Sequence, residues 1–96
     1  MKRLQQIESL DSSKLRFLDI DDLIILSKLF SGSSLVATSR TLGLSQPAVS
    51  NRLRKIEQVF ATSIVEKKGR SVSLSDRGYM ICRRANDSLK ILIGLL

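Results

Sequence analysis

The 96-residue sequence has no histidine and no tryptophan, and it contains one cysteine, Cys82, and one proline, Pro47. Without histidine, and with a single cysteine, the chain has no internal disulfide, no Cys/His zinc site and no Ser/His or Cys/His nucleophile pair. Its few carboxylates are not grouped into an acid–base set. The sequence therefore argues against an enzyme and predicts no cofactor and no metal, with Cys82 as a small core or helix-interface residue.

Long apolar runs and aromatic residues are also scarce. No stretch reaches the ~20 apolar residues of a membrane span, and Lys2 and Arg3 are not followed by the apolar run of a signal peptide. Aromatic residues make up 4% of the chain, which argues against an aromatic-lined pocket for a small molecule. We therefore expect a single compact domain in the cytoplasm.

Basic residues, by contrast, are abundant and unevenly distributed. The net charge is +7. Residues 1 to 22 hold four basic and five acidic side chains, so the whole basic excess lies in the remainder of the chain. This distribution favours a polyanionic partner, for which nucleic acid is the first candidate and an anionic membrane surface the second.

The N-terminal part has one weak and one strong helical signal. Residues 1–17 are predicted to form an extension with one short helix, interrupted by the sequence DSSK at 11–14. The weak period consists of Leu4, Ile7 and Leu10. A firm helix is predicted at 20–31, where Asp19 and Asp22 form a variant of the capping box. The residues expected to share its core-facing side are Ile20, Leu23, Leu26 and Phe30.

Two helices joined by a tight turn are predicted next. Ser34 can cap a helix over residues 35–42, and Gly43 occupies the position at which a left-handed residue ends a helix. Ser45 caps the following helix, and Pro47 fits its first turn, where no backbone N–H is needed. Such a pair is typical of a helix-turn-helix.

The helix at 46–60 has two contrasting faces. Its core-facing stripe is Val49, Leu53, Ile56 and Phe60. The opposite face carries Gln46, Pro47, Ser50, Asn51 and Arg54, with Arg52 and Lys55 on its flanks. A helix fits the major groove of DNA, where the amide of Gln46 can meet a base edge, and Asn51 and Arg54 can reach bases or the backbone. Ser50 is small enough to allow close approach.

A short hairpin and a long helix complete the pattern. Residues 63–75 change to a period of two around the sequence KKGR at 67–70, which predicts two short strands with a basic tip. Ser75 then caps a helix that runs from about residue 76 to the end of the sequence. Its apolar seam consists of Ile81, Ala85, Leu89, Leu92 and Leu96. The near-coiled-coil spacing favours a dimer interface, and packing of this helix onto its own domain is the alternative.

Several motifs resemble the N-terminal DNA-binding domain of LysR-type transcriptional regulators. The most specific are LGLSQPAVS at 42–50, LRKIE at 53–57 and KKGRSVSLSDRG at 67–78. The resemblance implies a mainly α fold: a winged helix-turn-helix over residues 18–75, with a three-helix core and a β-hairpin wing. It also implies that residues 76–96 form a long linker helix that makes the dimer.

The resemblance also implies roles for individual residues. It places Gln46, Pro47 and Ser50 beside bases, Ser34 and Ser45 near phosphates, and Lys67 and Arg70 at contacts of the wing. Together with the faces described above, this gives two predicted groups. The base-reading group is Gln46, Pro47, Ser50, Asn51 and Arg54. The group that contacts the DNA backbone is Ser34, Ser45, Arg52, Lys55, Lys67, Lys68 and Arg70.

The chain departs from the family at several places. Thr38 and Ser39 stand where a pair of alanines is usual, so their hydroxyls must be satisfied between helices, for example by bonding to the preceding turn. Asn51 stands where arginine is common. Family members normally continue into an effector-binding domain, so we expect either a fragment of a full regulator, which we favour, or a short protein.

The sequence thus predicts a sequence-specific DNA-binding domain of a bacterial transcriptional regulator. Its expected partners are double-stranded DNA and a second copy of the chain, in a homodimer or a higher oligomer, without a membrane or a small-molecule ligand. The alternative is a short interaction module that pairs with a full-length regulator through its C-terminal helix. The alternative requires that helix but not the face that carries Gln46.

Overall fold

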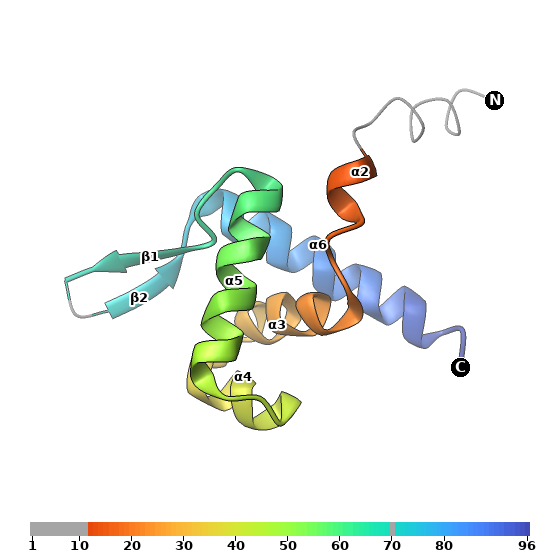
Figure 1. Cartoon of the computed structure of the whole chain (residues 1–96), viewed down its shortest axis with the longest axis horizontal. Helices are drawn as coiled ribbons and strands as arrows, with labels where there is room; N and C mark the ends of the chain where they lie inside the picture. Colours follow the sequence, from red (N-terminus) through yellow and green to blue (C-terminus); the bar gives the residue numbers. More distant parts are fainter. Residues whose placement is uncertain (1–11, 70) are drawn as a thin grey trace.

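The computed structural model describes residues 12–69 and 71–96; Leu4, Ile7, Leu10 and Arg70 lie outside the described residues. The elements are α2 (Ser12–Leu15), α3 (Ile20–Phe30), α4 (Leu35–Leu42), α5 (Gln46–Phe60), β1 (Val65–Lys68), β2 (Ser71–Leu74) and α6 (Asp76–Ile93). The helices form a core, from which the hairpin projects at one side and the end of α6 at the other (Figure 1). This arrangement confirms the predicted mainly α, winged helix-turn-helix class.

The short helix α2 lies where the sequence DSSK was expected to interrupt helical structure, so that prediction is wrong for residues 12–14. A serine-rich segment can begin a helix as readily as it interrupts one, so composition did not decide between the two. After Leu15 the chain continues in tight turns, in which the N–H of Phe17 donates to the carbonyl of Lys14 (3.2 Å). Leu18 then packs against the core.

Helix α3 begins with the predicted capping box. The backbone N–H of Asp22 donates to the Asp19 carboxylate (2.9 Å), and the N–H of Asp19 donates to that of Asp22 (3.0 Å). The predicted core-facing side is partly wrong, because Ile20 is 53% exposed. The buried residues of α3 are Asp22, Ile25, Leu26 and Leu29, and Leu23 and Phe30 are half-buried. The buried face of α3 therefore includes Asp22 in place of Ile20, and Asp22 is paired with Arg52 and Lys55 of α5.

The helix-turn-helix forms as predicted. Ser34 accepts the N–H of Ala37 (3.0 Å) at the start of α4, and Ser45 accepts the N–H of Ala48 (3.2 Å) at the start of α5. Gly43 ends α4 in the left-handed region, with φ 66°, where glycine has no Cβ penalty. The turn therefore follows from local signals.

Two buried hydroxyl groups of α4 find hydrogen-bond acceptors within the same segment of the chain. Thr38 and Ser39 are both buried. The Thr38 hydroxyl donates to the carbonyl of Ser34 (2.8 Å), and the Ser39 hydroxyl donates to that of Val36 (2.7 Å). This confirms the expected bonding to the preceding turn.

The hairpin pairs antiparallel, with Val65 opposite Leu74 and Lys68 opposite Ser71. Ser75 connects the residues before β1 to the start of α6. Its hydroxyl donates to the carbonyl of Ser63 (2.5 Å) and accepts the N–H of Gly78 (2.8 Å). The backbone of Ile64 lies directly against Gly78, the third residue of α6. The wing is therefore attached to the first turn of α6.

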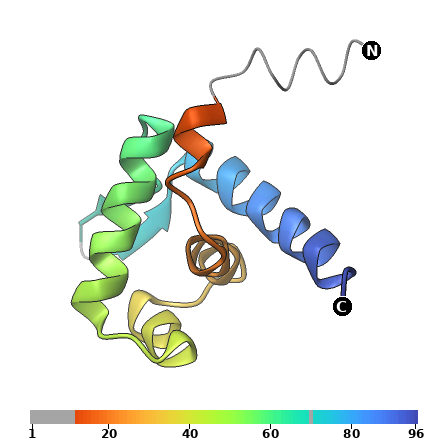
Figure 2. The same cartoon turned by 45° about the vertical axis from the view of Figure 1, so that its right-hand side comes forward.

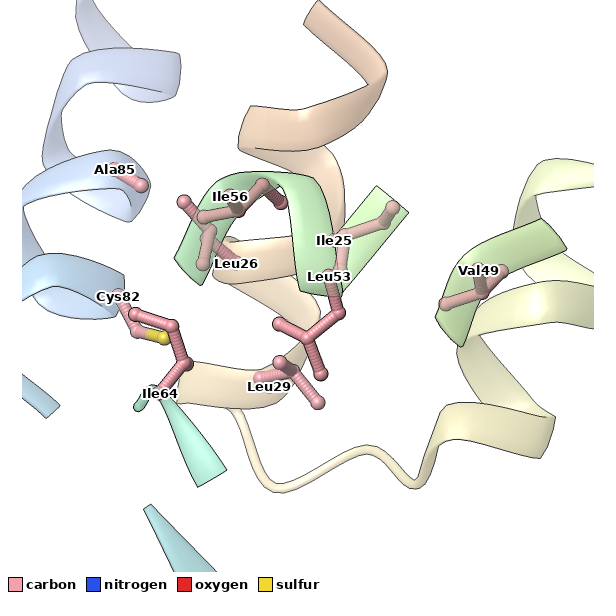
Figure 3. Packing of buried hydrophobic residues seen from close by; sticks show 9 residues of the cluster. All are labelled: Ile25, Leu26, Leu29, Val49, Leu53, Ile56, Ile64, Cys82 and Ala85. Atoms are coloured by element: carbon pink, nitrogen blue, oxygen red, sulfur yellow. The ribbon is translucent and has the colours of Figure 1, made fainter. Parts of the chain in front are cut away.

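The core lies where α3, α5 and α6 meet (Figure 3). It consists of Ile25, Leu26, Leu29, Val49, Leu53, Ile56, Ile64, Cys82 and Ala85. Figure 2 shows α3 nearly end-on between α5 and α6. Val49, Leu53 and Ile56 are buried as predicted, and Phe60 is half-buried.

Helix α6 packs along α3, so two of the five residues of its predicted seam belong to its own domain. The Ser27 hydroxyl of α3 donates to Asn86 (2.7 Å), and the rings of Phe30 and Tyr79 lie 5.5 Å apart. Ala85 is buried and Ile81 packs on the core, which corrects their assignment to a dimer interface. The helix ends at Ile93, so the predicted seam residue Leu96 lies beyond it, fully exposed.

Cys82 occupies the core, as predicted, with no exposed surface. Burial raises the pKa of its thiol to about 11, because a low-dielectric surrounding disfavours the thiolate. The thiol is therefore protonated at neutral pH and serves as a packing residue.

Candidate nucleic-acid interface

The predicted base-reading residues lie together on the outer face of α5. Gln46, Pro47, Asn51 and Arg54 are exposed, and Ser50 is half-buried. They share this face because the buried stripe of the same helix is turned toward α3. The exposed face offers amide, hydroxyl and guanidinium groups, which are the side-chain types that pair with base edges.

A groove connects this helix to the wing. Its volume is about 850 Å³, and Gln46 lines it together with residues of α4 and of both strands. The strand residues are Val65, Val72, Ser73 and Leu74, and the α4 residues are Leu35 and Val36. The structure therefore brings Gln46 and the wing to one side of the molecule, although they are far apart in the sequence.

The strand register separates the lysines of the wing. Lys67 is opposite Val72, and it shares a face of the hairpin with Val65, which lines the groove. Lys68 lies on the other face of the hairpin, with Glu66. Both lysines are exposed, and Arg70 is outside the described residues.

The N-termini of α4 and α5, which begin after Ser34 and Ser45, also lie at the surface. Each serine side chain caps its helix, and the first backbone N–H groups of a helix favour an anion. The two serines thus mark positions suited to phosphate.

Arg52 and Lys55 are placed differently from the prediction that they contact the DNA backbone. Arg52 lies 2.9 Å from the carboxylate of Asp19, 3.8 Å from that of Asp21 and 3.3 Å from that of Asp22. Lys55 lies 2.5 Å from Asp22. Both cations therefore point toward the start of α3, away from the face that carries Gln46, and they are engaged within the protein.

This ion-pair cluster changes the titration of its exposed members. Burial opposes ionisation of Asp19, but hydrogen bonds from Arg52 and from the backbone of Asp22, together with the charges of Arg52 and Lys55, lower the pKa of its carboxyl group. The hydrogen bond to Asp19 is the main cause that raises the pKa of Arg52. The sequence contains a signal for this cluster, because Asp19, Asp21 and Asp22 stand close together in an otherwise basic chain. Such a group of acids needs cations, and the basic helix α5 supplies them.

Residues 12–69 and 71–96, which the structure describes, contain neither a candidate metal site nor a candidate membrane-spanning helix. No group of three or more metal-binding side chains occurs there. None of the helices in this part of the chain has the length and apolar character needed to cross a membrane.

A three-helix core with a helix-turn-helix, a hairpin wing and a capped helix after it defines a winged helix-turn-helix protein. The family model described as bacterial regulatory helix-turn-helix protein, lysR family, matches residues 20–79. The chain belongs to this family. Because its relatives are transcriptional regulators, the family supports the expectation that the chain is not an enzyme.

Individual relatives and solved structures agree with this assignment. The chain is 32% identical over 59 residues to the regulator PcaQ of Agrobacterium fabrum, covering 62% of this chain and 19% of PcaQ. It is 30% identical over 63 residues to the regulator TdcA of Escherichia coli, covering 66% of this chain and 20% of TdcA. The chain therefore spans about a fifth of these relatives.

The fold is also similar to that of the BenM DNA-binding domain, solved in complex with benA site 1 DNA. The TM-score is 0.72 at 17% sequence identity, over 81% of this chain and 88% of that one. At this identity the similarity establishes the shared fold.

Proposed function

We propose that this chain binds DNA sequence-specifically as the DNA-binding domain of a transcriptional regulator. The observation that carries the proposal is that Gln46 and the wing line one groove in a chain of the lysR family. The net charge of +7 supports a polyanionic partner. Since bacterial DNA lies in the cytoplasm, we expect the protein to act there.

We assign base reading to the exposed face of α5: Gln46, Pro47, Ser50, Asn51 and Arg54. The proposed contacts with the DNA backbone are Ser34, Ser45, Lys67, Lys68 and Arg70. Arg52 and Lys55 are left out of this group because phosphate would have to compete with carboxylates already within 2.5 to 3.8 Å of them. Backbone contacts supply most of the affinity, and base contacts supply the preference for sequence.

The substitution Lys67→Ala tests the role of the wing. We expect weaker binding to every duplex, and a slope of log K against log salt that is smaller by about one unit for each bound copy of the chain, because each copy loses one phosphate contact. The measurement is a fluorescence-anisotropy titration at several salt concentrations. Lys14→Ala is the matched control, since Lys14 is an exposed lysine of α2 and belongs to neither proposed contact surface. Equal slopes for the two variants would contradict the assignment.

We also propose that the chain forms a homodimer through the distal part of α6 and the residues after it. Supporting this, Ile91, Leu92, Ile93, Leu95 and Leu96 are 37 to 105% exposed. Leu89 is half-buried and lies at the boundary between this surface and the domain's own packing. We accordingly divide the chain into an extension (1–17), a DNA-binding domain (18–75) and a linker helix (76–96), whose first turns pack on the core.

Leu92→Asp tests this interface. We expect the dimer to dissociate at least tenfold more readily, because a charge would be buried in an apolar contact. Sedimentation equilibrium measures the dissociation constant. Ser88→Asp adds the same charge one turn earlier, at an exposed residue, and should change it little. Similar constants for the Leu92 variant and the wild type would place the interface elsewhere.

A further inference from the structure

Helix α5 is held against the domain by two kinds of contact. One is the buried stripe of Val49, Leu53 and Ile56, which is non-directional and tolerates small rotations of the helix. The other is the pairing of Arg52 and Lys55 with Asp22 of α3. Hydrogen bonds to a charged group depend on direction, so this second contact opposes rotation of α5 about its own axis. The Glu57 carboxylate, which accepts the backbone N–H of Ile64 (2.8 Å), is a further directional contact near the other end of the helix.

Asp22 is the centre of this contact. It has no exposed surface, and both of its carboxylate oxygens are used. Oδ1 accepts from Arg52 (3.3 Å), whereas Oδ2 accepts from Lys55 (2.5 Å) and from the backbone N–H of Asp19 (3.0 Å). The same carboxylate therefore completes the cap of α3 and holds two residues of α5 that are nearly one turn apart.

The outer face of α5 depends on the same rotation. Arg52 and Lys55 point toward α3, and Gln46, Asn51 and Arg54 are exposed to solvent on the remaining circumference. Any rotation of α5 that would redirect Gln46 must also move Arg52 and Lys55 away from a buried carboxylate. Leaving that carboxylate with fewer donors is costly, so the pairing opposes the rotation.

We propose that Asp22 is a positioning residue for DNA recognition: it does not touch DNA, but it sets the orientation in which α5 presents Gln46 and Arg54. The inference rests on the proposed function. It goes further by assigning sequence preference in part to a residue on another helix, on the opposite side of α5 from the DNA.

Asp22→Asn tests the inference, with Asp21→Asn as the matched control. Both variants remove one negative charge from adjacent positions of α3, but Asp21 is about half exposed and lies 3.8 Å from Arg52. The probes are a duplex selected by the wild-type protein from a random pool and a shuffled duplex of the same composition. We expect the affinity ratio of the two duplexes to fall about tenfold in Asp22→Asn and to stay unchanged in Asp21→Asn.

Binding to the shuffled duplex separates a positioning role of Asp22 from a role in stability alone. A loss of folded protein lowers the apparent affinity for both duplexes equally, whereas a change in the orientation of α5 lowers mainly the affinity for the selected duplex. A variant that is only less stable, yet folded by circular dichroism, keeps the wild-type ratio; that result would overturn the inference. If Asp22→Asn does not fold, Lys55→Gln removes one of the two α5 partners of Asp22 and is expected to lower the ratio. Lys14→Gln, at an exposed lysine of α2, is the control.

A measurement without DNA separates this inference from the proposed function. If the wild-type protein itself shows no preference between the duplexes, the proposed function fails. The amide chemical shifts of residues 46–54 in the free protein then decide about Asp22. We expect them to change in Asp22→Asn and not in Asp21→Asn; unchanged shifts in both variants would contradict the positioning role.

Discussion

Replacing Gly78 with alanine is expected to destabilise the domain by roughly 3 kcal/mol and to lower Tm by on the order of 15 °C. A Cβ atom at this position would lie 2.8 Å from the carbonyl carbon and from the Cα of Ile64, and closer still to its oxygen. These are backbone atoms at the base of the wing, so no side chain can turn aside. The clash outweighs the gain of about 1 kcal/mol that alanine normally brings to a helix.

Gly94→Ala is the control for this prediction. Gly94 is the C-cap residue of α6, with φ −62°, and a Cβ there would lie 3.1 Å from the carbonyl oxygen of Ile91, a far milder contact than that at Gly78. We expect its unfolding midpoint in urea to match that of the wild type. A Gly78→Ala variant as stable as Gly94→Ala would show that the wing and α6 are not in contact as described.

Replacing Gln46 with alanine is expected to weaken binding to the selected duplex by about 1 to 3 kcal/mol and binding to a shuffled duplex very little. Gln46 is exposed at the first position of α5 and lines the groove shared with the wing. An amide there can donate to and accept from one base, a pattern that alanine cannot replace. Phosphate contacts, which do not depend on sequence, would remain.

Gln58→Ala makes the same chemical change three turns further along α5, at another exposed glutamine. We expect it to leave both affinities nearly unchanged in the same titrations. Equal losses on the two duplexes for Gln46→Ala would remove Gln46 from the base-reading group. Wild-type function in a Gln46→Ala, Arg54→Ala variant would instead favour the interaction module that pairs through α6.

The features that depend on neighbouring residues could be predicted from the sequence. The caps at Asp19, Ser34, Ser45 and Ser75 all form, because each is a bond within four residues. Gly43 adopts the expected left-handed conformation for the same reason. The position of α5 and its outer face followed from these signals and from a clear apolar stripe.

The features that depend on distant residues could not be predicted in the same way. Periodicity alone placed Ile20 in the core, but the structure buries Asp22, whose partners Arg52 and Lys55 are about thirty residues away. A buried carboxylate is acceptable only when such partners are present, and periodicity does not show them. The same pairing removed Arg52 and Lys55 from the surface predicted to meet phosphate.

The apolar seam of α6 shows the same limit. Ile81, Ala85, Leu89 and Leu92 are evenly spaced, yet the first two pack on their own domain and Leu92 is 37% exposed. A regular stripe indicates that a helix face is covered, but not which molecule covers it. Only the packing of α6 along α3 divides the stripe into an internal part and an exposed part.

The most direct test of the account is selection of bound duplexes from a random pool at about 0.15 M salt, where non-specific binding is weak. We predict enrichment of one motif made of two related half-sites, because two copies of α5 would each read one half. A Gln46→Ala protein should enrich this motif less strongly. Recovery of sequences no different from the starting pool would contradict sequence-specific binding by this domain.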